Sequence, residues 1–77
     1  MSTVIAQTLD FKGLSCPLPI VKTAKALKGL PSGTLVEVLA TDPGSVPDFA
    51  AWATATGNDL VSSAEEDGVY RYVIRRR

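Results

Sequence analysis

The sequence predicts an α/β protein of the α+β two-layer type, in which two helices cover one face of a mixed four-stranded sheet. Its 77 residues are 45% hydrophobic and 21% charged, a composition typical of a globular protein, and the length allows a single domain over residues 1–77. Strand-like and helix-like spacings of apolar residues follow one another in the order β-α-β-α-β-β. The dipeptide Asp67-Gly68 between the last two apolar runs is typical of a tight hairpin turn.

The first two elements are a strand over residues 4–11 and a helix over residues 17–28. The strand is predicted from apolar side chains that share one face, namely Ile5, Leu9 and Phe11. The helix is predicted from apolar side chains at helical spacing, namely Ile20, Ala24 and Leu27. Gly29 and the Pro-Ser-Gly cluster that follows are expected to end it.

The second strand and the second helix are expected over residues 34–40 and 46–56. The strand is nearly continuous in apolar and β-branched residues, which predicts a central strand that is covered on both faces. Ser45 is expected to cap the helix, with Asp48 completing a capping box, and Gly57 to end it. The side chains expected to point inward are Val46, Phe49, Trp52 and Ala53.

The last two strands, residues 60–65 and 69–75, are expected to pair as a hairpin around the Asp-Gly turn. Two strand-helix-strand units followed by a hairpin give a mixed sheet. Because such crossovers are right-handed, both helices are expected on the same face. The other face then stays open or is used for contacts.

Cys16 is the only cysteine and lies at the expected start of the first helix, within the Gly-Leu-Ser-Cys-Pro-Leu-Pro run from Gly13 to Pro19. A helix N-terminus has unpaired backbone N–H groups and a partial positive charge, and both favour thiolate over thiol. Pro17 suits the first helical position, because its missing N–H would be unpaired there. A free cysteine is more often a small buried side chain, but this loop-to-helix junction favours a reactive thiol.

The composition excludes several classes of function. Histidine is absent, so the chain has no Cys-His dyad, no catalytic triad and no imidazole ligand, and we expect no metal and no cofactor. Eight basic and eight acidic residues give a net charge of zero, which argues against direct nucleic-acid binding. The sequence contains neither a signal peptide nor a membrane-spanning run, and with its lone thiol we expect a cytoplasmic protein without a membrane partner.

Four charged residues are candidates for a supporting role near Cys16. Asp10 and Asp42 follow the first two strands, at the end of the sheet where the thiol is expected, and would orient the loop or polarise the site. Aspartates at such positions are more often simple turn or cap residues. Lys22, and with less support Lys12, would raise the local positive potential, although a solvated lysine is the default on a polar helix face.

The exposed side of the first helix is a candidate docking surface. Helical spacing places Leu18 together with Lys22 and Lys25, opposite the apolar face. An exposed leucine beside a reactive thiol offers apolar area to a partner, and the lysines would steer an acidic protein toward it.

With these motifs the sequence resembles the TusA family of sulfur-carrier proteins, also described as SirA-like, over essentially the whole chain. The matching stretches are Leu9-Asp10-x-x-Gly13-Leu14-x-Cys16-Pro17-x-Pro19, Leu30-x-x-Gly33, Thr41-Asp42-Pro43 with Asp48-Phe49, and Tyr70-x-Tyr72-x-Ile74-Arg75. A Cys-Pro-x-Pro element alone would be a weak signal, but in this context it is a strong one.

The resemblance implies a persulfide carrier of the sulfurtransferase type. Cys16 would accept sulfane sulfur from a donor protein, a cysteine desulfurase or a rhodanese-type protein, and pass it to an acceptor protein. The acceptor would serve transfer-RNA thiolation, molybdenum-cofactor maturation or sulfur oxidation. A single thiolate suits such a relay, because the chain has no second cysteine to release the sulfur internally. We expect the carrier to be a monomer.

Two positions depart from the family pattern and leave the partners open. Members linked to transfer-RNA thiolation commonly have an acidic residue where this chain has Leu18, and a histidine within the stretch that here reads Gly57-Asn58-Asp59. The alternative function is a non-catalytic regulatory or RNA- or protein-interaction module, in which Cys16 senses oxidation. Arg75-Arg76-Arg77 adds positive charge, but zero net charge and the lack of an aromatic stacking platform count against RNA.

Overall fold

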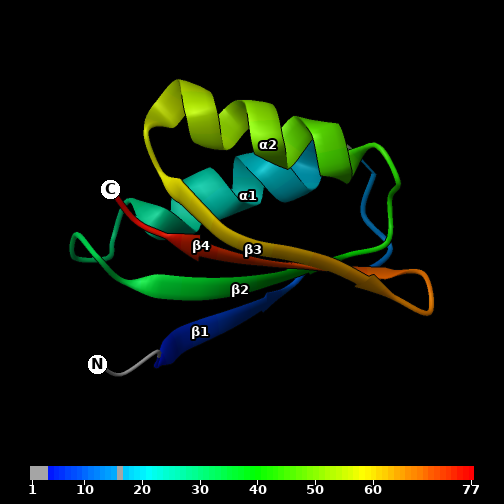
Figure 1. Ribbon diagram of the computed structural model, residues 1–77, viewed down its shortest axis with the longest axis horizontal. Helices are drawn as coiled ribbons and strands as arrows, with labels where there is room; N and C mark the ends of the chain where they lie inside the picture. Colours follow the sequence, from blue (N-terminus) through cyan, green and yellow to red (C-terminus); the bar gives the residue numbers. More distant parts are fainter. Residues whose placement is uncertain (1–3, 16) are drawn as a thin grey trace.

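The computed structural model describes residues 4–15 and 17–77 and confirms the predicted order of elements (Figure 1). In chain order the elements are β1 (Ile5–Asp10), α1 (Leu18–Leu27), β2 (Leu35–Ala40), α2 (Ser45–Thr56), β3 (Asp59–Glu66) and β4 (Val69–Arg75). Each boundary lies within one residue of the expected one.

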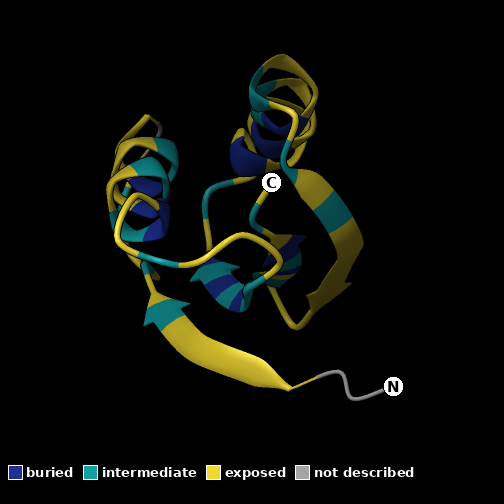
Figure 2. Ribbon diagram, turned by 90° about the vertical axis from the view of Figure 1, so that its left-hand side faces the viewer, coloured by how far each residue is buried: buried dark blue, intermediate teal, exposed yellow. Residues whose placement is uncertain are grey.

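The four strands form one mixed sheet in the order β1-β2-β4-β3. β1 pairs with β2 in parallel, whereas β4 lies between β2 and β3 and is antiparallel to both. β2 and β3 are therefore parallel to each other, and each strand-helix-strand unit joins two parallel strands. Both helices lie on the same face of the sheet, as predicted, so the protein has two layers (Figure 2).

The core lies between the helices and that face of the sheet, and its buried residues are Leu27, Val36, Val38, Ala40, Phe49, Tyr72 and Ile74. The expectation that β2 is covered on both faces was wrong. Its side chains alternate between buried and half-buried, because both helices lie on one side. On the open face the half-buried Glu37 instead forms an ion pair of 3.1 Å with Arg71 on β4.

The inner faces of β1 and α1 differ in detail from the predicted ones. Leu9 and Phe11 pack against the core, but Ile5 is exposed, because the pairing with β2 shifts register just after it. On α1 the buried residues are Pro19, Thr23 and Leu27. Ile20 and Ala24 flank this stripe and are only half-buried, so the helix is rotated from the expected orientation.

The start of α2 does not use the predicted capping box. The helix begins at Ser45, one residue early, so Gly44 occupies the cap position, and no side chain in the described part of the protein caps the helix. The Ser45 hydroxyl is buried and lies 2.7 Å from the hydroxyl of Tyr72 on β4. Asp42, and not the expected Asp48, forms a hydrogen bond at the start of the helix. Asp42 Oδ1 accepts a hydrogen bond of 3.1 Å from the Gly44 N–H.

The early start of α2 also explains why Val46, which was expected to point inward, is exposed. Phe49 and Ala53 are buried and Trp52 is half-buried, as predicted, but Val46 is 41% exposed. The buried positions repeat every four residues from the first helical one, which leaves Val46 on the outside. Gly57 ends the helix with φ 77° and donates its N–H to Ala53, which confirms the predicted glycine stop.

The hairpin between β3 and β4 turns at the predicted dipeptide. Asp67 and Gly68 both have positive φ, 52° and 80°, as a two-residue type I′ turn requires. This turn sets the pairing of the two strands, with Glu66 opposite Val69.

Candidate functional site

The predicted nucleophile, Cys16, lies outside the described residues, but the chain on both sides of it is described. Ser15 precedes it and Pro17 follows it, and both are exposed. This segment connects the carboxyl end of β1 to the N-terminal end of α1 (Figure 1). The chain therefore enters α1 at the end of the sheet where β1 and β2 both finish.

The loop that leads to this helix is tied to the end of β2 by two hydrogen bonds. The Phe11 N–H donates to the Leu39 carbonyl over 2.9 Å, and the Gly13 N–H donates to Thr41 Oγ1 over 2.9 Å. Gly13 has φ 86°, a conformation that side-chain-bearing residues rarely adopt. Sequence reasoning identified Gly13 but named Thr41 only within the Thr41-Asp42-Pro43 stretch and gave its hydroxyl no role. The signal for that role was its place directly after a strand parallel to β1.

The entry into α1 is built by two prolines with different roles. Pro17 was expected in the first helical position, but it lies one residue before the helix, with φ −95°. Pro19 occupies the first turn instead, where an N–H would lack a partner, and its side chain is fully buried. The Leu18 N–H donates to the Ser15 carbonyl over 2.9 Å, which ties the first residue of α1 to the end of the loop before it.

The electrostatics of this helix start favour an anion. Within residues 4–15 and 17–77, no side chain caps α1 through a hydrogen bond, and its first turn holds no acidic residue. The partial positive charge of the helix end is therefore not countered by a carboxylate of the helix itself. A thiolate at this junction would lie in the environment that stabilises it.

The two candidate aspartates lie at this end of the sheet, and both behave as turn residues. Asp10 accepts a hydrogen bond of 3.1 Å from the Lys12 N–H, and the Lys12 ammonium lies 3.7 Å from its other oxygen. Asp42 accepts from the Gly44 N–H at the start of α2. Each carboxylate thus orients its own loop, and a direct effect of either one on the thiol stays a prediction.

The outer face of α1 presents apolar and basic side chains together. Leu18 is 46% exposed and Val21 54% exposed, and Lys22 and Lys25 are also exposed. Val21, Lys22 and Lys25 follow Leu18 by three, four and seven residues, so the four side chains lie on one side of the helix. We call these four residues the α1 outer face. Sequence reasoning missed Val21, although its spacing from Leu18 was the signal that could have found it.

The described part of the chain offers neither a metal site nor a membrane-spanning helix. Residues 4–15 and 17–77 contain no group of three or more side chains that could hold a metal ion. None of the helices within the same residues is both long enough and apolar enough to span a bilayer.

Known proteins resemble this chain in sequence and in structure. Residues 7–76 match the family described as Sulfurtransferase TusA. The chain is 50% identical over 70 residues to the sulfur carrier protein TusA of Allochromatium vinosum. This match covers 91% of the chain and 92% of that protein. The chain is 49% identical to a putative sulfur carrier protein of Halobacterium salinarum over 94% of the chain and 90% of that protein. The crystal structure of a SirA-like protein from Desulfitobacterium hafniense superposes with a TM-score of 0.80 at 31% identity, over 90% of the chain and 95% of that structure.

Proposed function

Because the chain belongs to the TusA family, we propose that it is a sulfur carrier that holds sulfane sulfur as a persulfide on Cys16. The observation that carries the proposal is the position of the only thiol in the sequence, between Ser15 and Pro17 at an α1 entry that no side chain of the described residues caps. The names of the relatives, sulfur carriers that match nearly the full chain, support the same function.

The proposed transfer needs no cofactor, because it exchanges one sulfur–sulfur bond for another. The Cys16 thiolate attacks the outer sulfur of a persulfide on the donor protein. A new bond forms between Cys16 Sγ and that sulfur, while the old bond breaks and its electron pair leaves with the donor cysteine as a thiolate. An acceptor thiolate then repeats the same attack on the sulfur held by Cys16, which restores the free thiolate.

The residues around the thiol would act by positioning it. In this proposal Gly13, Pro17 and Pro19 set the path of the loop into α1, and Asp10 and Asp42 orient the loops that flank it. The sulfur donor is a cysteine desulfurase or a rhodanese-type protein. The acceptor protein works in transfer-RNA thiolation, molybdenum-cofactor maturation or sulfur oxidation, and the carrier acts as a monomer in the cytoplasm.

Sulfur loading tests this function directly. The reduced protein is incubated with a cysteine desulfurase and cysteine, and its intact mass is then measured under non-reducing conditions. The expected result is a gain of one sulfur atom that a reducing agent removes. A reversible gain of oxygen without any gain of sulfur would contradict the carrier function and would favour a redox sensor.

We further propose that the α1 outer face is where donor and acceptor proteins dock. Leu18 and Val21 offer apolar area within a turn of the helix start, and the two lysines add positive charge beside them. Neither Lys22 nor Lys25 forms an ion pair with any residue in 4–15 or 17–77, so their charges are open to an acidic partner. Association that depends on these lysines would weaken as the salt concentration rises.

The variant Leu18→Glu is expected to slow sulfur exchange with the native partner roughly tenfold, the equivalent of about 1.4 kcal/mol of lost apolar burial. Its melting temperature should stay nearly unchanged, because the side chain is exposed. Val61→Glu is the matched control, since Val61 is 45% exposed but lies on β3, at the edge of the sheet far from β1. Equal transfer rates for both variants would place the docking surface elsewhere.

A further inference from the structure

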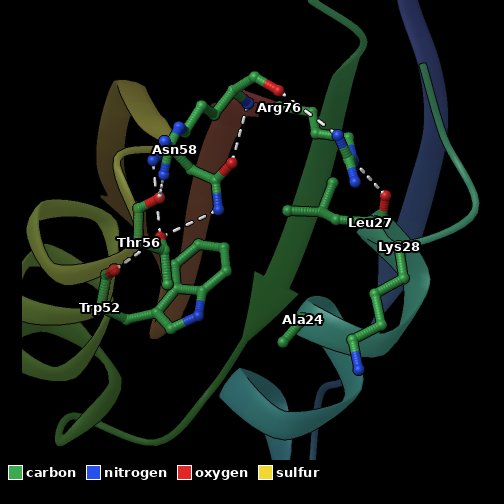
Figure 3. Close-up of a pocket in the computed structure, with 8 residues that line it drawn as sticks. Ala24, Leu27, Lys28, Trp52, Thr56, Asn58 and Arg76 are labelled. Atoms are coloured by element: carbon green, nitrogen blue, oxygen red, sulfur yellow. Dashed lines mark hydrogen bonds between the residues drawn. The ribbon is translucent and has the colours of Figure 1, made fainter. Parts of the chain in front are cut away.

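A cavity lies at the end of the two helices that is opposite to the loop from β1 to α1. It has a volume of about 400 Å³ and lies between the carboxyl-terminal ends of α1 and α2. The residues that define its chemistry are Leu27, Lys28, Trp52, Asn58, Arg76 and Arg77 (Figure 3). The sulfur-transfer proposal uses none of them.

The lining of this cavity is strongly basic in a chain of zero net charge. It contains three cations, Lys28, Arg76 and Arg77, and no acidic side chain. The ion pairs found among residues 4–15 and 17–77 involve other basic residues, so none of these three charges is neutralised by a carboxylate there. The positive potential is therefore local to the cavity.

The two arginines are held in place by the ends of the helices. Arg76 Nε donates to the carbonyl of Leu27, the last residue of α1, and its Nη1 donates over 3.3 Å to the Arg77 backbone oxygen. Arg77 Nη1 donates over 3.2 Å to the carbonyl of Thr56, the last residue of α2, and its backbone N–H donates over 2.8 Å to Asn58 Oδ1. Such bonds stabilise helix ends, but they use only part of the five N–H donors of each guanidinium.

Helix capping explains why the two arginines lie here, but it does not explain the positions of Lys28 and Trp52. Lys28 extends along one side of the cavity, and the Trp52 indole forms the opposite wall (Figure 3). The indole is half-buried and is held edge-on by Phe49, with ring centroids 5.9 Å apart and planes at 84°. A fixed aromatic wall facing an unpaired cation across a concave space is the arrangement of a ligand site.

We propose that this cavity binds a mononucleotide, a phosphate ester attached to a planar ring. The charge of a phosphate monoester complements three cations, and a guanidinium fork matches phosphate oxygens better than it matches most other anions. The planar base would lie against the indole. The volume falls within the roughly 300–1,000 Å³ of small-molecule sites, and it suits one nucleotide rather than a strand.

Trp52 is the only tryptophan, so its fluorescence reports on this cavity directly. Titration of the full chain with adenosine monophosphate is expected to change the emission in a saturable way, with an affinity that falls as salt is added. Adenosine and inorganic phosphate should each bind more weakly than the intact nucleotide. Lys28→Ala should weaken binding roughly tenfold, as expected for a lost charge-assisted hydrogen bond. Lys25→Ala, three residues before Lys28 but outside the cavity, should bind the nucleotide like the parent protein.

Three outcomes would overturn the proposal. One is unchanged Trp52 emission together with unchanged amide resonances of residues 24–28 and 52–58 at millimolar nucleotide. Another is an equal loss of binding for Lys28→Ala and Lys25→Ala. The third is much tighter binding of a short oligonucleotide with a steep salt dependence, which would assign the surface to nucleic acid. Circular dichroism of both variants verifies that they are folded.

Discussion

The variant Cys16→Ser is expected to take up no sulfur in the loading reaction, whereas the parent protein gains one sulfur atom. The chain contains no other thiol, and a hydroxyl does not form a persulfide under these conditions. The fold should be unaffected, because the neighbours Ser15 and Pro17 are exposed and serine closely matches cysteine in size. Intact mass measures the loading, and circular dichroism measures the fold.

Ser15→Ala provides the control for this experiment. It removes a hydroxyl one residue away, but it keeps the backbone carbonyl that accepts the Leu18 N–H. This variant should load sulfur like the parent protein. Sulfur that remains attached to the Cys16→Ser protein after purification would show that the carrier site is elsewhere.

The variant Phe49→Ala is expected to lose about 3–5 kcal/mol of unfolding free energy, as large-to-small core substitutions of phenylalanine do. The Phe49 side chain is fully buried and stacks on Tyr72 with ring centroids 4.6 Å apart. It also supports the edge of Trp52. A domain of this length has about 4–12 kcal/mol in total, so the loss would remove much of its stability.

This loss is measured by urea unfolding, with circular dichroism and Trp52 fluorescence as the two probes of the unfolded fraction. Val46→Ala is the matched control on the same helix, because Val46 is 41% exposed and its truncation should change stability by about 0.5 kcal/mol or less. Similar midpoints for the two variants would contradict the placement of Phe49 at the centre of the core.

Some residues of the candidate site could be identified from the local sequence, and others only from the tertiary structure. Gly13, Pro17 and Pro19 could be identified from their sequence alone, because each has a backbone property that few residues share. Thr41 could not, since its hydroxyl matters only because β1 and β2 lie side by side and bring it to the Gly13 N–H. The roles of Asp10 and Asp42 as turn residues were among the sequence expectations, and the structure shows both of them bonded within their own loops.

The basic cavity could not have been predicted at all. Leu27 and Arg76 are separated by 49 positions in the sequence, and Thr56 and Arg77 by 21. In the sequence the final arginines read only as a short positive run. Their position at two helix ends follows from the pairing of β4 with β2 and β3, which carries the chain back between the helices.

The sequence by itself determined the order of the six elements and their bounds to within one residue, because these depend on local periodicity and on turn chemistry such as Asp67-Gly68. It also determined that Cys16 is the only thiol in the chain. Only the tertiary structure decided the rotation of each helix about its axis, which buries Thr23 on α1 and Ser45 on α2. Several rotations of a helix bury similar apolar area, and the choice depends on contacts with distant residues, such as the hydrogen bond that turns Ser45 inward to Tyr72 and leaves Val46 in solvent.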